Sequence, residues 1–323
     1  MEPIEPLPES VAAAEVQAAG AFAKRIADNI RRAVKVRDEV LGHVIVALIA
    51  EGHILVEDYP GVGKTALARA LARSVDCQFA RVQCTADLLP ADIVGTNVFN
   101  QREARFEFRP GPIFANVVLV DEINRASPKT QSGLLECMQE RSVTVDVHSH
   151  ELARPFVVLA TQNPVEFEGT YPLPEAQVDR FMTRLSLGYP SAAAEVAMLR
   201  SHEAADRIDE IEPVASAADL LLVQDAARRV YASDALRTYV VSLLARTRED
   251  PRVELGASPR GGLLLLRAAK ARALLHGRDH ALVDDVQALA TVVLAHRIVL
   301  APEAMDVTGE RVVADALATT PGL

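Results

Sequence analysis

Residues 57–65 read Glu-Asp-Tyr-Pro-Gly-Val-Gly-Lys-Thr, and this stretch decides the fold. An apolar run at 53–56 precedes it, and an alanine- and leucine-rich segment at 66–72 follows. The pattern predicts a strand, a glycine loop and a helix. Because Gly61 and Gly63 carry no Cβ, the loop can turn its backbone N–H groups inward. Together with the N-terminus of the following helix, these groups form a cradle for an anion.

The last two residues of the loop indicate which anion it holds. Lys64 can reach the β- and γ-phosphates of a nucleotide, and the Thr65 hydroxyl can bind Mg²⁺. The phosphate-loop pattern has glycine at its first position, where this chain has Asp58, so a chance Gly-Lys-Thr in a strand–turn–helix is the alternative. The residues expected to contact the nucleotide are Asp58, Tyr59, Pro60, Gly61, Val62, Gly63, Lys64, Thr65 and Ala66.

Two adjacent carboxylates, Asp121 and Glu122, follow a second strongly apolar segment. Residues 117–120 read Val-Val-Leu-Val, without alternation, which is typical of a strand buried on both faces. Ligands of open parallel sheets bind at the carboxyl ends of the strands. We expect Asp121 to hold Mg²⁺ through its water shell and Glu122 to orient and polarise the attacking water. A strand end with solvated acids is the alternative for this pair taken alone.

A further apolar strand is predicted at 156–161, and it is followed by Gln-Asn-Pro. Because parallel strands present their carboxyl ends at one edge of a sheet, we expect Asn163 at the same edge as Asp121. There its carboxamide could position the water or sense the γ-phosphate. Asn-Pro by itself is only a turn signal. Shorter strands are predicted at 79–84 and 182–187.

Two other segments resemble hairpin arms. Residues 98–99 and 106–108 flank a polar turn at 100–105, and together they form either an edge hairpin that covers a helix or a pore or substrate loop. Residues 143–147 alternate in the same way, and His148 and His150 are expected to flank their turn. Histidines at a loop tip are commonly just polar surface residues, and a metal site with Asp146 is the alternative.

Composition limits the class of protein. Half of the 323 residues are hydrophobic, only 4% are aromatic, and there is no tryptophan, which suits an aliphatic core of helices on a parallel sheet. The net charge of −10 argues against nucleic-acid binding through the average surface. Three cysteines, Cys77, Cys84 and Cys137, lack metal-ligand spacing and predict buried thiols in a reducing compartment. We expect a cytoplasmic protein without a signal peptide or membrane insertion.

The chain changes composition after its last predicted strand. We expect an N-terminal tail and packing helix at 1–36, an α/β nucleotide-binding core at 37–190 and a smaller, all-helical domain at 191–323. Ser258 is a predicted helix cap, with Pro259 at the first helical position and Arg260 next. The segments after 301 give no clear element.

Taken together, the motifs resemble the MoxR family of AAA+ ATPases. The similarity runs from about residue 38 to 300 and is most distinctive at 108–114, 121–126, 160–164, 169–181 and 256–260. The resemblance implies a P-loop core with a parallel five-stranded sheet between helices and a helical lid. It also implies ATP as substrate, Mg²⁺ as cofactor, and a ring, usually a hexamer, whose active sites are shared between subunits.

The resemblance also assigns roles to three further residues. By position, Asn163 is similar to the first sensor, Arg180 to an arginine finger that reaches the ATP of a neighbouring subunit, and Arg260 to a second sensor on the lid. A structural ion pair with Asp179 or a lid acid is the alternative for Arg180. Leu282 and Val283 depart from the Thr-Pro that commonly begins a lid helix, which leaves that helix boundary open.

The resemblance implies an ATP-driven chaperone or remodelling motor that acts on a protein client. Its relatives often work with a von Willebrand factor A domain protein in metal insertion or complex maturation, and that partner would act in trans. A nucleic-acid motor and a magnesium-chelatase-like ATPase subunit are the alternatives, together with a nucleotide switch that does not hydrolyse. The acidic charge and the few aromatic residues count against the first of these.

Overall fold

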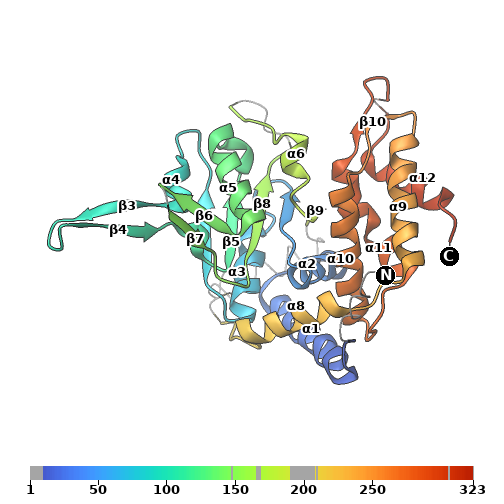
Figure 1. Ribbon diagram of the computed structural model, residues 1–323, viewed down its shortest axis with the longest axis horizontal. Coiled ribbons are helices and arrows are strands. Elements are labelled where there is room, and N and C mark those ends of the chain that lie inside the picture. The colour runs from blue at the N-terminus through green and yellow to red at the C-terminus, as the bar shows by residue number, and fades with distance from the viewer. Residues whose placement is uncertain are drawn as a thin grey trace, which may run out of the picture. The chain divides into compact units, whose positions relative to one another are not determined.

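The computed structural model describes residues 10–146, 148–164, 169–189, 208, 210–304 and 306–322. These residues form two compact units, coloured along the chain in Figure 1. The sheet unit comprises Arg25–Leu220, and the helical unit comprises Met1–Lys24 with Leu221–Leu323. The division falls within α1 (Ala13–Ala33) and within α8 (Ala217–Arg229).

The sheet unit is built on five parallel strands in the order β2-β5-β8-β1-β9. This confirms the predicted α/β fold with a five-stranded parallel sheet. The central strands are buried on both faces, as their unbroken apolar sequences require. The strands are β1 (Ile54–Glu57), β2 (Phe79–Gln83), β5 (Val117–Asp121), β8 (Val157–Gln162) and β9 (Thr183–Leu185).

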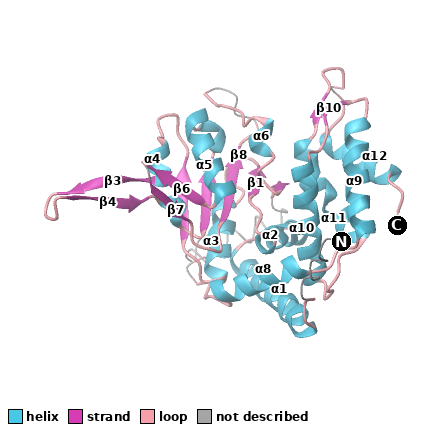
Figure 2. Ribbon diagram, in the orientation of Figure 1, coloured by secondary structure: helices cyan, strands magenta, loops and turns pink. Residues whose placement is uncertain are grey.

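Helices pack on this sheet, as the chain's aliphatic composition predicts (Figure 2). The side chains of Val118, Val120 and Val158 are fully buried in one apolar cluster, which also contains residues of α5. Within the part of this unit that the structure describes, the helices that lie wholly inside it are α2 (Asp38–Ile49), α3 (Lys64–Ser74), α4 (Pro90–Val94), α5 (Pro128–Glu140) and α6 (Glu175–Val178), with short 3-10 turns at Pro112–Phe114 and Ile123–Arg125.

Two antiparallel hairpins, β3–β4 and β6–β7, interrupt the parallel strands. The first, β3 (Gly95–Asn100) with β4 (Arg105–Pro110), extends away from the sheet in Figure 1. Its register pairs Phe99 with Phe106, and their rings meet edge to face with centroids 5.3 Å apart. The side chains of both phenylalanines are exposed, so the predicted hairpin presents an apolar face near its tip.

The second hairpin differs from the sequence expectation in where it turns. It pairs β6 (Ser142–Val145) with β7 (His148–Glu151), with Val145 opposite His148. The chain therefore turns before His148, which begins β7, and His150 lies further along the same strand, so the two histidines do not stand on either side of the turn. The ring of His150 stacks on Phe108, with centroids 4.0 Å apart. Within the described ranges, no group of three metal-ligating side chains is present that could hold an ion. His150 therefore packs between the two hairpins, against Phe108 of β4.

The helical unit contains three elements that the sequence did not predict. A short antiparallel pair joins β10 (Val253–Leu255) to β11 (Val299–Leu300), and Thr308 caps a last helix by accepting a hydrogen bond from the Arg311 amide. The predicted Ser258 cap is confirmed, because its hydroxyl accepts from the Gly261 amide at 3.1 Å. Among the described residues, the helices that lie wholly within this unit are α9 (Asp234–Glu249), α10 (Pro259–Leu275), α11 (Val283–Leu294) and α12 (Gly309–Thr319), with a 3-10 turn at Ala295–Arg297.

The cysteines are free thiols. Cys84 and Cys137 are buried, as expected, and Cys77 is half-buried. Burial raises the pKa of Cys84 to about 12 and the pKa values of the other two to about 11. All three are therefore unreactive thiols at neutral pH.

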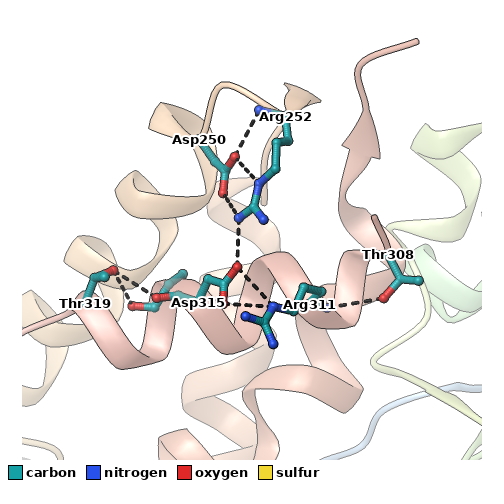
Figure 3. A network of polar contacts seen from close by, with 7 residues as sticks. Asp250, Arg252, Thr308, Arg311, Asp315 and Thr319 are labelled. Carbon is teal, nitrogen blue, oxygen red and sulfur yellow. Dashed lines mark hydrogen bonds and ion pairs between the residues drawn. The ribbon is translucent and has the colours of Figure 1, made fainter. Parts of the chain in front are cut away.

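Two clusters of charge stabilise the helical unit. In Figure 3, Arg252 bridges Asp250, next to the end of α9, to Asp315 on α12, and Arg311 contacts the same Asp315. The second cluster surrounds Asp285, whose side chain is fully buried. It receives hydrogen bonds from Arg272 and Arg278 and from the backbone amide of Leu282 at 2.9 Å. The Asp285 carboxylate thus caps α11, which explains how the helix begins at Val283 after a leucine that cannot cap it.

The Asp285 cluster predicts a large loss of stability when its carboxylate is removed. Asp285→Asn leaves two arginines without their anion, and the loss of a buried partner costs roughly 3–5 kcal/mol. Because the arginine side chains are 25% and 24% exposed, we expect the lower end, about 3 kcal/mol, in urea unfolding followed by circular dichroism. Asp234→Asn removes an exposed ion pair with Arg237 and should cost less than about 1 kcal/mol. Equal stability of the two variants would contradict this account.

The same cluster predicts how stability changes with pH. Burial alone would raise the pKa of Asp285, but hydrogen bonds from Arg278, the Leu282 amide and Arg272 outweigh it and hold the pKa below its ordinary value. A lowered pKa means that the unfolded chain binds the proton more tightly, so stability rises with pH. The contribution should be complete above pH ~4 and decline as the pH falls below it. Asp285→Asn should lack this component of the acid dependence.

Candidate functional site

The carboxyl ends of the parallel strands bring most of the predicted residues to one edge of the sheet. Strand β8 lies between β5 and β1, with Val120 opposite Ala160 and Glu57 opposite Gln162. Asp121 is the last residue of β5, and Asp58 and Asn163 directly follow the last residues of β1 and β8. The predicted loop, the two carboxylates and the carboxamide thus share this edge.

The phosphate loop has the backbone geometry of an anion cradle. Gly61 and Gly63 have φ angles of +83° and +93°, which side chains rarely adopt, and Gly63 stands at the start of α3. No side chain caps this helix, and its first internal hydrogen bond runs from the Leu67 amide to Gly63. The amides of Lys64, Thr65 and Ala66 therefore lack helical partners and are available to an anion.

Lys64 lies over its own loop. Its Nζ donates a hydrogen bond to the carbonyl oxygen of Asp58 at 3.0 Å. The ammonium is thus held next to the amides of the first helical turn. A phosphate in the cradle would have to draw Lys64 from this carbonyl.

Asp121 and Glu122 are held by side chains of neighbouring strands. The carboxylate of Asp121 accepts hydrogen bonds from Thr161 at 2.6 Å and from Arg81 at 2.6 Å. Glu122 has a left-handed backbone, with φ 56°, which turns the chain out of β5. Its carboxylate lies 3.1 Å from Gln83 Nε2 and 3.1 Å from Arg125 Nε. Both acids are therefore preorganised by donors.

Thr161 connects the two acids, and the sequence did not indicate this role. Its hydroxyl donates to Asp121 and accepts from the backbone amide of Glu122 at 2.9 Å. The Thr161 side chain is fully buried. A hydroxyl at the end of an otherwise apolar strand was the available signal, because a buried polar group needs partners. Arg81 and Gln83 were likewise not predicted, since only the pairing of β2 with β5 places them beside the carboxylates.

Arg180 and Arg260, the two arginines that the sequence analysis assigned to the site, lie on other parts of the chain than β5, the strand that ends at Asp121 and leads into Glu122. Arg180 follows α6, and its backbone amide donates to the Gln177 carbonyl at 3.1 Å. Its Nε is buried, and within the described residues it has no hydrogen-bond partner. Arg260 belongs to the helical unit, at the second position of α10 after the Ser258 cap. The roles of both arginines stay predictions.

The oxygen donors of the site fit a hard cation. Thr65 supplies a hydroxyl at the first turn of α3, and Asp121 supplies a carboxylate at the end of β5. Mg²⁺ prefers one or two such protein ligands together with phosphate oxygens. The uncapped amides of α3 fit the phosphates themselves, so the residues present are compatible with a magnesium nucleotide.

Comparison with known proteins identifies the class and then the family. Residues 53–183 match the family model described as ATPase family associated with various cellular activities (AAA), and residues 245–316 match that of the AAA lid domain. The fold is therefore that of an AAA+ ATPase: a P-loop core with a helical lid. Since Chaperone MoxR1 of Mycobacterium tuberculosis is 40% identical over 86% of this chain and 75% of its own, the chain belongs to the MoxR family.

Other relatives agree with this assignment. The uncharacterized protein YeaC of Bacillus subtilis is 50% identical over 86% of this chain and 87% of its own length. Protein MoxR of Methylorubrum extorquens is 33% identical over 87% and 88%. A crystal structure from Cytophaga hutchinsonii, described as a candidate ATPase, superposes with a TM-score of 0.89 at 36% identity and covers 95% of this chain and 97% of its own. In the described part of the chain, no helix is long and apolar enough to cross a membrane.

The bridging hydroxyl predicts a specific loss of turnover. Thr161→Val keeps the shape of the side chain but removes both hydrogen bonds, which should lower kcat for ATP about 10–100-fold and cost about 1–3 kcal/mol of stability. Thr161→Ser retains the hydroxyl and should stay close to wild type. Steady-state phosphate release with a parallel nucleotide titration separates turnover from binding. A wild-type kcat in Thr161→Val would show that the hydroxyl between Asp121 and Glu122 is not needed for turnover.

Proposed function

We propose that this chain hydrolyses ATP to ADP and phosphate and uses the reaction to remodel a protein client. The observation that carries the proposal is the shared sheet edge, where the strand register brings together the phosphate loop before an uncapped helix, a pair of preorganised carboxylates and an asparagine. Phosphoryl transfer needs mainly positioning and charge stabilisation, which these residue types can supply. The relative named Chaperone MoxR1 supports the remodelling part.

Each residue of the edge has a distinct task in this proposal. Lys64 and the loop amides bind the phosphates. Mg²⁺, held by Thr65 and Asp121, would neutralise charge on the phosphate oxygens when bound. Glu122 orients the attacking water and accepts a hydrogen bond from it, and Asn163 holds the water from the other side. Thr161 keeps the two acids in register.

The proposed active site is shared between copies of the chain in a ring, most simply a hexamer. Arg180 would extend its guanidinium to the γ-phosphate bound by the neighbouring copy, and such fingers are worth roughly 10³–10⁵ in rate. Arg260 would act as the second sensor, carried on the lid. A cation is unfavourable at the start of a helix, and a nearby phosphate would offset this cost.

The two hairpins are the proposed contacts to the client. The β3–β4 hairpin exposes Phe99 and Phe106, which are 49% and 71% accessible. Exposed apolar side chains of this kind are typical of a surface that binds another protein. We place the protein in the cytoplasm, with a von Willebrand factor A domain partner in trans and complex maturation or metal insertion as the process.

The phosphate-loop lysine predicts the loss of nucleotide binding. Lys64→Ala removes charge-assisted hydrogen bonds worth ~1.5–3 kcal/mol each, so the Kd for ATP should rise at least about 100-fold. Isothermal titration calorimetry measures the Kd directly. Lys35→Ala, which removes an exposed lysine outside the site, is the matched control and should bind as wild type. An unchanged Kd in Lys64→Ala would refute the assigned loop.

A shared site predicts complementation between two inactive variants. Arg180→Ala should bind ATP but lose turnover, because the finger acts on a neighbour. Glu122→Gln should also bind ATP and lose turnover, because its carboxamide cannot act as the base. Mixed rings should regain activity at interfaces where an intact Glu122 faces an intact Arg180. If mass spectrometry shows mixed oligomers and phosphate release stays at the level of the single variants, the shared site is wrong.

A further inference from the structure

The first residue of the phosphate loop has an acidic side chain that the proposed chemistry does not use. Asp58 is 3% exposed, although a carboxylate beside a bound triphosphate would be repelled if it faced the phosphates. Its Oδ2 accepts hydrogen bonds from the backbone amides of Leu187 and Gly188, the latter at 3.0 Å. The side chain is therefore directed to the carboxyl end of β9.

These amides continue the edge of the sheet. Strand β9 pairs with β1 only up to Leu185, which lies opposite Val56. Beyond that point the backbone of β1 turns into the phosphate loop, and the Asp58 carboxylate accepts the next amides of the neighbouring segment. Two amides on one carboxylate oxygen are charge-assisted bonds, which are stronger than bonds between neutral groups.

The backbone of Asp58 is bonded at the same time to two other parts of the site. Its amide donates to the Gln162 carbonyl at 3.2 Å, and its own carbonyl accepts from Lys64. Next to it, the ring of Tyr59 stacks on Tyr189, with centroids 5.6 Å apart and planes 15° apart. Residues 58 and 59 are thus clamped to residues 187–189.

We propose that Asp58 is a positioning residue that fastens the phosphate loop to the carboxyl end of β9. This inference rests on the proposed function, because the loop that it positions is taken to bind ATP. When phosphate draws Lys64 from the Asp58 carbonyl, the carboxylate still holds the start of the loop. Glycine, the usual residue of the pattern, would leave the Leu187 and Gly188 amides unpaired, and a loosened loop would have to be ordered on binding.

Introducing the glycine that begins the general phosphate-loop pattern should therefore weaken ATP binding. Asp58→Gly should raise the Kd for ATP about tenfold, whereas Asp58→Asn, whose amide oxygen can accept the same two bonds, should stay within about threefold of wild type. Calorimetric titration of the full-length chain measures both. Equal affinity of wild type and Asp58→Gly, or equal weakening in both variants, would overturn the inference.

Two measurements report on the clamp itself. The chain has no tryptophan, so Tyr189→Trp provides a single fluorescent reporter against Tyr59. Its emission should shift when Asp58→Gly is added and stay unchanged with Asp58→Asn; identical spectra in all three backgrounds would contradict the clamp. In the wild type, hydrogen–deuterium exchange should show protected amides at 187 and 188, and exchange as fast as in exposed loops would overturn the proposal without any variant.

The outcomes separate this inference from the proposed function. If the wild type fails to bind ATP, or if Lys64→Ala binds it normally, the proposed function is wrong. If the wild type binds and Lys64→Ala does not, while Asp58→Gly binds as tightly as wild type, only the role of Asp58 is wrong.

Discussion

The parallel register of β1, β8 and β5 is the constraint on which the site depends. It makes the three strands end together, so that the loop after β1, the acids at the end of β5 and the asparagine after β8 meet at one edge. Side chains alternate along a strand, so a slip of one residue would turn Asp121 to the opposite face of the sheet. The apolar residues that bury these strands on both faces therefore also determine the chemistry at their ends.

Each acid beside the phosphate loop is accompanied by donors that hold it. Thr161 and Arg81 bind Asp121, Gln83 and Arg125 flank Glu122, and backbone amides hold Asp58. In the helical unit, Asp285 is held in the same way by two arginines and one amide. A buried or half-buried carboxylate that lacked such donors would take up a proton or reorient. Pairing thus preserves both charge and direction, which a site for magnesium and phosphate requires.

Local patterns predicted the main elements because their signals lie within a few residues. The unbroken apolar runs before Asp121 and Asn163, and the glycines before Lys64, each specify a strand end or a loop without reference to the rest of the chain. The partners of the acids could not be found in this way. Arg81 lies on β2, and only the pairing of that strand with β5 brings it to Asp121. Asp58 shows the same limit, since its departure from the glycine pattern has a structural reason only once β9 is placed beside β1.

The most direct test of the account is a structure of the assembled Glu122→Gln protein with ATP and Mg²⁺. The account predicts triphosphate against the amides of Gly61–Ala66, the ion between Thr65 and Asp121, and Arg180 of a neighbouring copy at the γ-phosphate. Nucleotide bound at another surface, with this edge of the sheet unliganded, would contradict it.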